Sequence, residues 1–346
     1  MTERIAEDIA PAAVFVRRDL ETEVCGRRGG VPAVQRECWS ARPGVAHPGQ
    51  PLALEAVLRH VLQLARACEP SAISSIDAAA GVRTAALLDD ALEACLQLDA
   101  ARLQLQNAIT TQREVETVSE MLAARVEAGQ ATRGEQRKLE AGLNLSREAV
   151  TGALHGWSQT GRRFTKLTHL LPVQLECIVD TLGPIPAEEM DRLAEACLWT
   201  HADVHLSLRQ RARAWTDRQT GSARHGRAKP EDFNVWVARI EQAREQAAAD
   251  FACAREVYLQ AILDHDREHA SFVKSRSLRR IAETNFRLGA RSATEFTDAL
   301  LDESRRLQAV FLLQAGGLLA KHRLYALAGE FPVLADVAEP GARGVD

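Results

Sequence analysis

The residues with the clearest potential for chemistry are two histidine pairs, each spaced by four positions. His201 and His205 form the first pair, and His265 and His269 form the second. Two imidazoles one helical turn apart can bind a transition metal from one helix face, but each pair supplies only two ligands. The sequence also lacks the H-E-x-x-H order that places a glutamate beside a metal as a base. A solvated helix face accounts for both pairs, and we predict no metal site.

The seven cysteines are scattered singly along the chain. None forms a C-x-x-C pair, and none has the close spacing of a zinc site. We expect small buried residues or free thiols at Cys25, Cys38, Cys68, Cys95, Cys177, Cys197 and Cys253. The sequence also shows no phosphate-binding glycine loop, no nucleophile elbow and no acid–base pair. It therefore predicts a protein that is not an enzyme, with no catalytic residues and no cofactor.

A basic run extends from Arg209 to Lys229. It contains seven basic residues, a single acid at Asp217, and Trp215. Such a run can contact anionic lipid headgroups or nucleic acid. A solvated helix end and loop explains the same composition, and the net charge of −4 is too small to predict a polyanionic partner. We therefore expect no nucleic-acid partner, and outer-membrane contact stays an open alternative.

Two further stretches combine a glycine, a hydroxyl residue and a glutamate at the same spacing. The copies lie 160 positions apart and consist of Gly129, Thr132 and Glu135, then Gly289, Ser292 and Glu295. Glycine can take the left-handed conformation that ends a helix. The hydroxyl then accepts a hydrogen bond from the first turn of the next helix, and the glutamate reaches back to the N–H of the cap residue. Each copy therefore predicts a tight turn between two helices, and the repetition favours duplicated units over coincidence.

Long helices are predicted on both sides of these turns. The chain is 46% hydrophobic but only 5% aromatic, a balance typical of closely packed helices. We expect residues 85–128 to pair antiparallel with 133–171, and 233–288 with 293–328. The third of these segments contains no Pro or Gly and has a heptad-like apolar seam. Strand signals are sparse, so the predicted fold class is all-α, with two repeated long antiparallel helical hairpins and minimal β-strand content.

This interpretation divides the chain into four segments. They are an irregular N-terminal arm at 1–50, a first helical-hairpin repeat at 51–181, a second repeat at 182–332 and a disordered tail at 333–346. Hairpins of this length expose apolar seams on more faces than one chain covers. Because an uncovered apolar stripe generally marks an interface, we expect self-association.

The second repeat resembles the C-terminal hairpin of the TolC-like outer-membrane efflux proteins. The tip of that hairpin has a glycine, small residues, a Ser or Thr and an acidic residue before a helix rich in Ala, Leu and Gln. The matching parts here are Gly289, Ser292, Thr294, Glu295, Ala299 and the ending LYALAGEF. The first repeat matches through Gly129, Thr132 and Glu135, and the resemblance covers roughly residues 85–330.

The resemblance implies a TolC-like α-barrel protomer that forms a homotrimer and acts in efflux or secretion. It implies that the tips, with the six residues named above, bind a periplasmic adaptor, and that the protein belongs to the outer membrane and periplasm. Family members carry membrane β-strands within each repeat. Only short polar segments stand in those places here, so the prediction includes a degenerate relative that keeps the helical scaffold.

A second interpretation is a cytoplasmic coiled-coil interaction or scaffold protein without transport activity. The chain as written begins MTERIAEDIAPAAVFVRRDL, which contains acidic residues and no apolar run long enough for a signal peptide. An odd number of unpaired thiols also suits a reducing compartment. The most apolar segment, AVFLLQAGGLLA from Ala309, is too short to span a bilayer as a helix.

Overall fold

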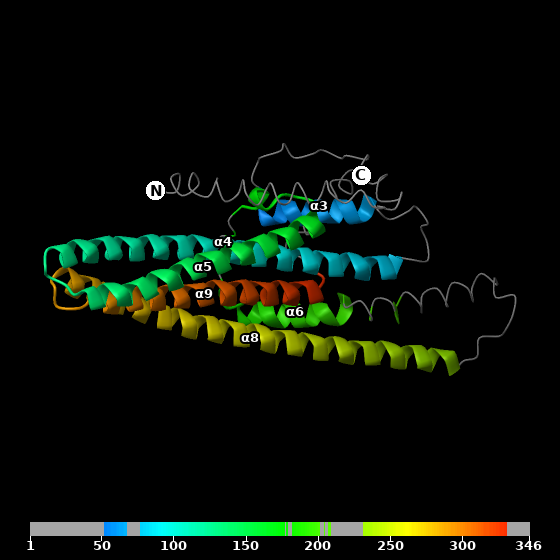
Figure 1. The fold of residues 1–346 in the computed structure, drawn as a ribbon. Coiled ribbons are helices and arrows are strands. Elements are labelled where there is room, and N and C mark those ends of the chain that lie inside the picture. The colour runs from blue at the N-terminus through cyan, green and yellow to red at the C-terminus, as the bar shows by residue number, and fades with distance from the viewer. Residues whose placement is uncertain are drawn as a thin grey trace, which may run out of the picture. The chain divides into compact units, whose positions relative to one another are not determined.

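The computed structural model describes residues 52–67, 77–176, 178, 182–200, 204, 207–208 and 231–330. The predicted N-terminal arm and tail lie outside these residues, as does the basic run. The segments where the resemblance would place membrane strands also fall largely outside them. The described part consists of α-helices, one 3-10 turn and one isolated β-bridge, which joins Leu52 to Leu175 (Figure 1). The predicted all-α fold class is confirmed.

The helices are long and are joined by short turns. Their bounds are α3 Leu54–Ala67, α4 Asp77–Glu127, α5 Arg133–Thr168, α6 Ala187–Thr200, α8 Glu231–Arg287 and α9 Ala293–Leu327, with the 3-10 turn η1 at Pro172–Gln174. Tight turns connect α4 to α5 and α8 to α9, so each pair runs antiparallel (Figure 1). Both predicted hairpins are therefore confirmed. None of the described helices is long and apolar enough to cross a bilayer.

Two helix ends differ from the prediction. α4 begins at Asp77, ahead of the predicted position 85, because the alanine-rich sequence around Gly81 sustains the helix across that glycine. α5 ends at Thr168, before the predicted position 171, because His169 takes a left-handed conformation with φ of 58°. The His169 N–H donates to the Thr165 carbonyl, which closes the helix end. A left-handed histidine has no clear signal in the sequence.

By their contacts the residues form two compact units, and α4, α8 and α9 contribute to both. Unit 1 draws its described residues from Met1–Pro70, Asp90–Val179 and Glu268–Leu312, and unit 2 draws its described residues from Ser71–Asp89, Asp180–Arg267 and Leu313–Asp346. Each unit contains residues from both sequence repeats. The repeat boundaries at 51–181 and 182–332 therefore stay a prediction.

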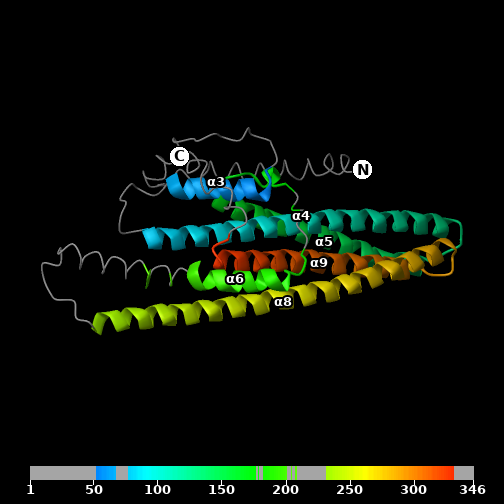
Figure 2. The same ribbon diagram turned by 180° about the vertical axis from the view of Figure 1, so that it is seen from behind.

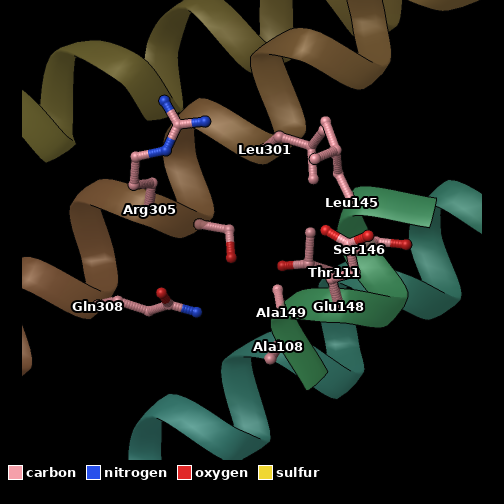
Figure 3. A pocket seen from close by; sticks show the side chains of 10 residues that line it. Ala108, Thr111, Leu145, Ser146, Glu148, Ala149, Leu301, Arg305 and Gln308 are labelled. Atoms are coloured by element: carbon pink, nitrogen blue, oxygen red, sulfur yellow. The ribbon is translucent and has the colours of Figure 1, made fainter. Parts of the chain in front are cut away.

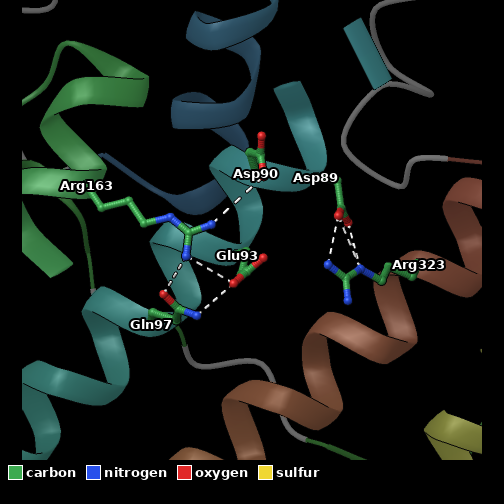
Figure 4. Close-up of polar contacts among 6 residues, drawn as sticks. All are labelled: Asp89, Asp90, Glu93, Gln97, Arg163 and Arg323. Carbon is green, nitrogen blue, oxygen red and sulfur yellow. Dashed lines mark hydrogen bonds and ion pairs between the residues drawn. The ribbon is translucent and has the colours of Figure 1, made fainter. Parts of the chain in front are cut away.

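Unit 1 contains two apolar clusters. The first brings α3 against α4 and α5, and its buried members are Val57, Cys95, Leu98, Ala101, Leu105, Trp157, Phe164 and Leu175. The second draws on α4, α5, α8 and α9, and its buried members are Val115, Val118, Leu122, Leu139, Ala282, Phe286, Ala293, Phe296 and Leu300. Polar contacts also join α4 and α5. Arg163 of α5 forms an ion pair with Glu93 of α4 at 3.1 Å and donates a hydrogen bond to Gln97 of α4 at 3.0 Å (Figure 4).

Unit 2 packs α6 against α8 and α9. Its buried residues are Met190, Leu193, Cys197, Val204, Ala243, Ala247, Phe251, Tyr258, Ala320, Leu324 and Ala328. The α8 members Ala243, Ala247 and Phe251 step by four, and Tyr258 follows seven positions later with the partly buried Ala254 between, as the predicted seam requires. Tyr258 fixes the segment before α6, because its hydroxyl donates to the Gly183 carbonyl at 2.6 Å and accepts from the Ile185 N–H at 3.0 Å. Arg323 of α9 pairs with Asp89 at 2.8 Å (Figure 4).

Candidate functional site at the hairpin turns

The first turn closes α4 with a glycine in the left-handed conformation. Gly129 has φ of 71°, a value that residues with a Cβ rarely adopt. Its N–H donates to the Val126 carbonyl at 3.0 Å, and the Gln130 N–H donates to the Arg125 carbonyl at 2.7 Å. These two bonds satisfy carbonyls that the helix end would otherwise leave unpaired, in the pattern of a Schellman motif. The predicted role of Gly129 in the turn is confirmed.

The same turn opens α5 with a complete capping box. Thr132 Oγ1 accepts from the Glu135 N–H at 3.2 Å. In return, the Thr132 N–H donates to Glu135 Oε2 at 3.0 Å. Both donors would lack a partner at the start of a helix, so the pair stabilises α5. The predicted positions of Thr132 and Glu135 are confirmed.

The second turn repeats the helix ending but not the whole cap. Gly289 has φ of 74°, and its N–H donates to the Phe286 carbonyl at 3.0 Å. Ser292 Oγ accepts from the Glu295 N–H at 3.2 Å, as predicted. The predicted return bond from Glu295 is wrong, because its carboxylate lies 3.5 Å from Arg291 Nε instead. The first copy has Ala131 at the position of Arg291, so no cation precedes its cap residue at that position.

Both turns lie at the same end of unit 1, over a shared core (Figures 1 and 2). Phe286 of α8 stacks on Phe296 of α9, with ring centroids 5.6 Å apart. Arg125 of α4 lies 4.5 Å above the Phe286 ring, and its Nη2 donates to the Phe286 carbonyl at 3.1 Å. Arg125 therefore ties the end of α4 to the end of α8 and places the two turns side by side.

The surface of the turns is exposed and partly apolar. Leu288, directly before the second glycine, is 76% exposed, and the corresponding residue of the first copy is Ala128. A Cβ added to Gly129 or Gly289 would meet no atom within 4 Å. Arg287 and Arg291 are also exposed. The second turn thus presents a leucine between two arginines, which a partner segment can contact.

Sequence reasoning missed Arg125 and Phe286, which hold the turns together. A basic residue in the last turn of α4 is a recognisable signal, since cations favour helix C-termini. Its contact with Phe286 depends on packing between residues 161 positions apart, which the spacing along the chain does not reveal.

The other candidate residues do not assemble into a site within the described part of the chain. His265 Nδ1 lies 3.3 Å from Asp266 Oδ1, whereas His201 and His205 lie outside the described residues. No group of three or more His, Cys, Asp or Glu side chains suited to a metal ion occurs among the residues that the structure describes. Cys95 and Cys197 are buried and Cys253 is exposed, all with free thiols. Burial raises the pKa of the Cys95 thiol to about 12, which keeps it protonated at neutral pH.

Duplicated helix hairpins, closed by paired glycine turns over one core, define the class of this all-α fold. A scan against protein-family models and a sequence search of curated proteins find no match. Solved structures do match. The Campylobacter jejuni CmeC outer membrane channel aligns with 79% of this chain and 68% of its own, at 11% identity and a TM-score of 0.53. The Neisseria gonorrhoeae MtrE outer membrane channel, in its open state, aligns with 80% of this chain and 71% of its own, at 14% identity and a TM-score of 0.52.

A third match is the outer membrane protein VceC from Vibrio cholerae. It aligns with 80% of this chain and 76% of its own, at 12% identity and a TM-score of 0.51. The matched structures are TolC-family outer-membrane channels, and none of them is an enzyme. At such low identity the likeness defines the fold. The resemblance seen in the sequence is therefore confirmed, and this chain has a divergent TolC-like helical fold.

Proposed function

We propose that the protein is a component of an efflux or secretion conduit and has no enzymatic activity. The observation that carries this proposal is the pair of matched glycine turns, held side by side by Arg125 on a TolC-like helical fold. In this function the turns around Gly129 and Gly289 bind a periplasmic adaptor. The six residues predicted from the sequence form the two turns and their caps, and Leu288 adds an exposed apolar contact.

Self-association as a homotrimer is part of the proposal. Within unit 1, α8 exposes Leu278 and Ile281, whose spacing of three places them on one helix face, and Leu288 follows directly after the end of the helix. They are 53%, 54% and 76% exposed. An apolar stripe of this kind usually contacts another copy or a partner. Three copies in contact through such stripes would surround a passage, and the assembly would act at the outer membrane and periplasm.

Gene deletion with complementation tests the conduit function. The wild-type chain should restore drug resistance and fractionate with the outer membrane. Gly289→Val should abolish resistance and adaptor cross-linking, and Gly129→Val should do so less severely, while helical circular dichroism and oligomeric state survive. Gly289→Asn distinguishes backbone strain from obstruction of adaptor binding, because asparagine tolerates the left-handed conformation but adds a side chain to the turn.

A matched control is Gly152→Ala in α5. Gly152 is exposed, has ordinary helical geometry, and has no atom within 4 Å of an added Cβ, so this variant should retain full resistance. Should both valine variants also retain resistance, the adaptor would not bind at the turns. A wild-type chain that confers no resistance and remains in the cytoplasm would support the interaction-protein interpretation instead.

A further inference from the structure

The last part of α8 and the turn after it carry a dense set of basic side chains. Residues 269–291 contain six Lys or Arg residues and a single acid, Glu283. Three of the arginines follow one another on α8 at spacings of four and seven positions, which places them within roughly 40° of one another around the helix. They are Arg276, Arg280 and Arg287, and all three are exposed. We call them the arginine face of α8.

Two of these three arginines have no ion pair within the described part of the chain. Arg287 pairs with Glu283 at 2.6 Å on its own helix, whereas the other two form no such pair there. Both act through space on Glu303 of α9 and oppose the rise in its pKa, but the ion pair of Glu303 is with Arg279, at 3.3 Å. The charge of the arginine face therefore remains available to a partner.

The first repeat carries the opposite charge at the same three positions. The copies lie 160 positions apart, so the residues of α4 that correspond to the arginine face are Glu116, Glu120 and Glu127. Glu120 and Glu127 are exposed, and Glu116 is half-buried. A charged segment that is attracted to one of these stripes is repelled by the other. A partner of one charge therefore distinguishes the two turns.

The arginine face is separate from the apolar face of α8 that the proposed trimer uses. Leu278 and Ile281 each lie about 100° or more around the helix from every one of the three arginines. Copies in contact through Leu278 and Ile281 would thus leave the arginines open. The arginine face reaches the second turn, because Arg287 is followed directly by Leu288, which is 76% exposed.

We propose that the arginine face binds an acidic helical segment of a partner protein. The three arginines extend along about 16 Å of α8, so the carboxylates that meet them must be held at matching intervals. A helix with Asp or Glu at spacings of four and seven positions does this, and an apolar residue near its end would contact Leu288. The inference rests on the proposed conduit function, in which this segment belongs to the adaptor. It assigns the acidic segment to the second turn and not to the first.

Fluorescence anisotropy with two synthetic peptides tests this face on the purified full-length protein. Both peptides are alanine-rich helices of about 18 residues with the same composition. One has its glutamates on a single face at the required spacings, and the other has them spread around the helix. We expect the first to bind at least fivefold more tightly, with an affinity that falls as salt is raised. No binding of the first peptide, or equal affinity for the two, would overturn the proposal.

Charge reversal assigns the binding to the arginine face. Arg280→Glu should weaken the first peptide about tenfold, because it replaces an attraction by a repulsion. Lys274→Glu is the matched control, because Lys274 is exposed and its reversal changes the net charge equally, but it lies about 120° or more from the arginines. Its affinity should stay within about twofold of the wild type. Circular dichroism checks folding, and a folded Arg280→Glu variant with wild-type affinity would contradict the proposal.

Two further measurements separate this proposal from a second copy as the occupant and from the conduit function itself. Arg280→Glu should sediment like the wild type. Dissociation of the assembly would show that a second copy, through the stripe of Glu120, occupies the face, which contradicts the proposal. In complementation, Arg280→Glu should lose resistance and Lys274→Glu should retain it. A wild-type chain that confers no resistance would refute the conduit function and the adaptor as partner, while the peptide titration decides by itself whether the face binds acidic helices.

Discussion

Arg279 of α8 is surrounded by three glutamates in unit 1. Its guanidinium lies 2.8 Å from Glu114 of α4, 3.3 Å from Glu303 of α9 and 3.8 Å from Glu283 of α8. The arginine side chain is only 22% exposed. Burial raises the pKa of the Glu303 carboxyl, and the nearby charge of Arg279 opposes that rise. A single cation therefore holds three helices together by separating carboxylates that would otherwise repel.

Replacing Arg279 by glutamine should destabilise the protein in a pH-dependent way. At pH 7 we expect a loss of about 1–2 kcal/mol in the free energy of unfolding, discounted for partial exposure. Burial raises the pKa of Glu303 in the folded state, and the loss of the Arg279 charge, which lowers that pKa, raises it further in the variant. Acidification therefore stabilises the folded variant more than it stabilises the folded wild-type protein. The deficit should shrink between pH 7 and pH 5 in urea denaturation. Arg287→Gln is the control, because Arg287 is 69% exposed and its loss should cost less than about 0.5 kcal/mol.

The conformation of Gly289 predicts which substitutions the second turn tolerates. Gly289→Val should lower the free energy of unfolding by about 1–2 kcal/mol, because a Cβ is strained at a φ of 74°. Gly289→Asn should cost clearly less, since asparagine occurs at such helix ends. Chemical denaturation of the two variants measures the difference. Equal losses would point to a clash rather than to backbone strain, although no atom lies within 4 Å of an added Cβ.

Among the elements, α9 contains two adjacent glycines, of which one has open space beside it and the other is packed closely against a side chain. A Cβ on Gly316 would meet nothing within 4 Å, whereas one on Gly317 would lie 2.4 Å from Leu182 Cδ2. Gly316→Ala should therefore stabilise the helix by up to about 1 kcal/mol. Gly317→Ala should be at least about 1 kcal/mol less stable than Gly316→Ala, because Leu182 must move. Thermal denaturation followed at a helical wavelength compares the two, and the opposite order would contradict this packing.

The helices and turns were predictable where local chemistry determines them. Gly129 and Gly289 end their helices because no other residue accepts that conformation as readily, and the paired hydroxyls mark the helix starts. The attachment of α3 was not predictable, because it depends on long-range bonds. The Glu176 N–H donates to the Leu52 carbonyl at 2.9 Å, and Arg102 donates to the Leu175 carbonyl at 3.1 Å. The sequence around each of these bonded residues gives no sign of which residue it bonds.

The candidate site was predictable only in part. The glycines and caps followed from their spacing, but Glu295 pairs with Arg291 because a nearby cation competes with the cap N–H. Arg125 and Phe286 depend on how α4 and α8 pack. A pocket lined by Thr111, Ser146 and Ser304 (Figure 3) depends on the packing of α4, α5 and α9, which the sequence of each helix alone does not reveal.

For the molecule as a whole, the proposal predicts assembly through the exposed face of α8. Ile281→Glu and Leu278→Glu should each weaken the trimer at least tenfold, because a charge in an apolar contact remains desolvated and unpaired. Val273→Glu is the control, because Val273 is 49% exposed but lies about 140° around α8 from Leu278 and about 80° from Ile281. Analytical ultracentrifugation at micromolar concentration measures the equilibrium. A wild-type chain that sediments only as a monomer would rule out the trimer.

The contact between Arg125 and Phe286 also makes the two halves of the chain non-interchangeable. Asn285 stands where the second copy would need an arginine, and Val126 stands where the first copy would need a phenylalanine. A chain built from two first halves would have two arginines and no aromatic ring to receive them. A chain built from two second halves would have rings without a cation. The two turns share a left-handed glycine and a hydroxyl cap, but each half of the chain supplies the side chain that the other lacks.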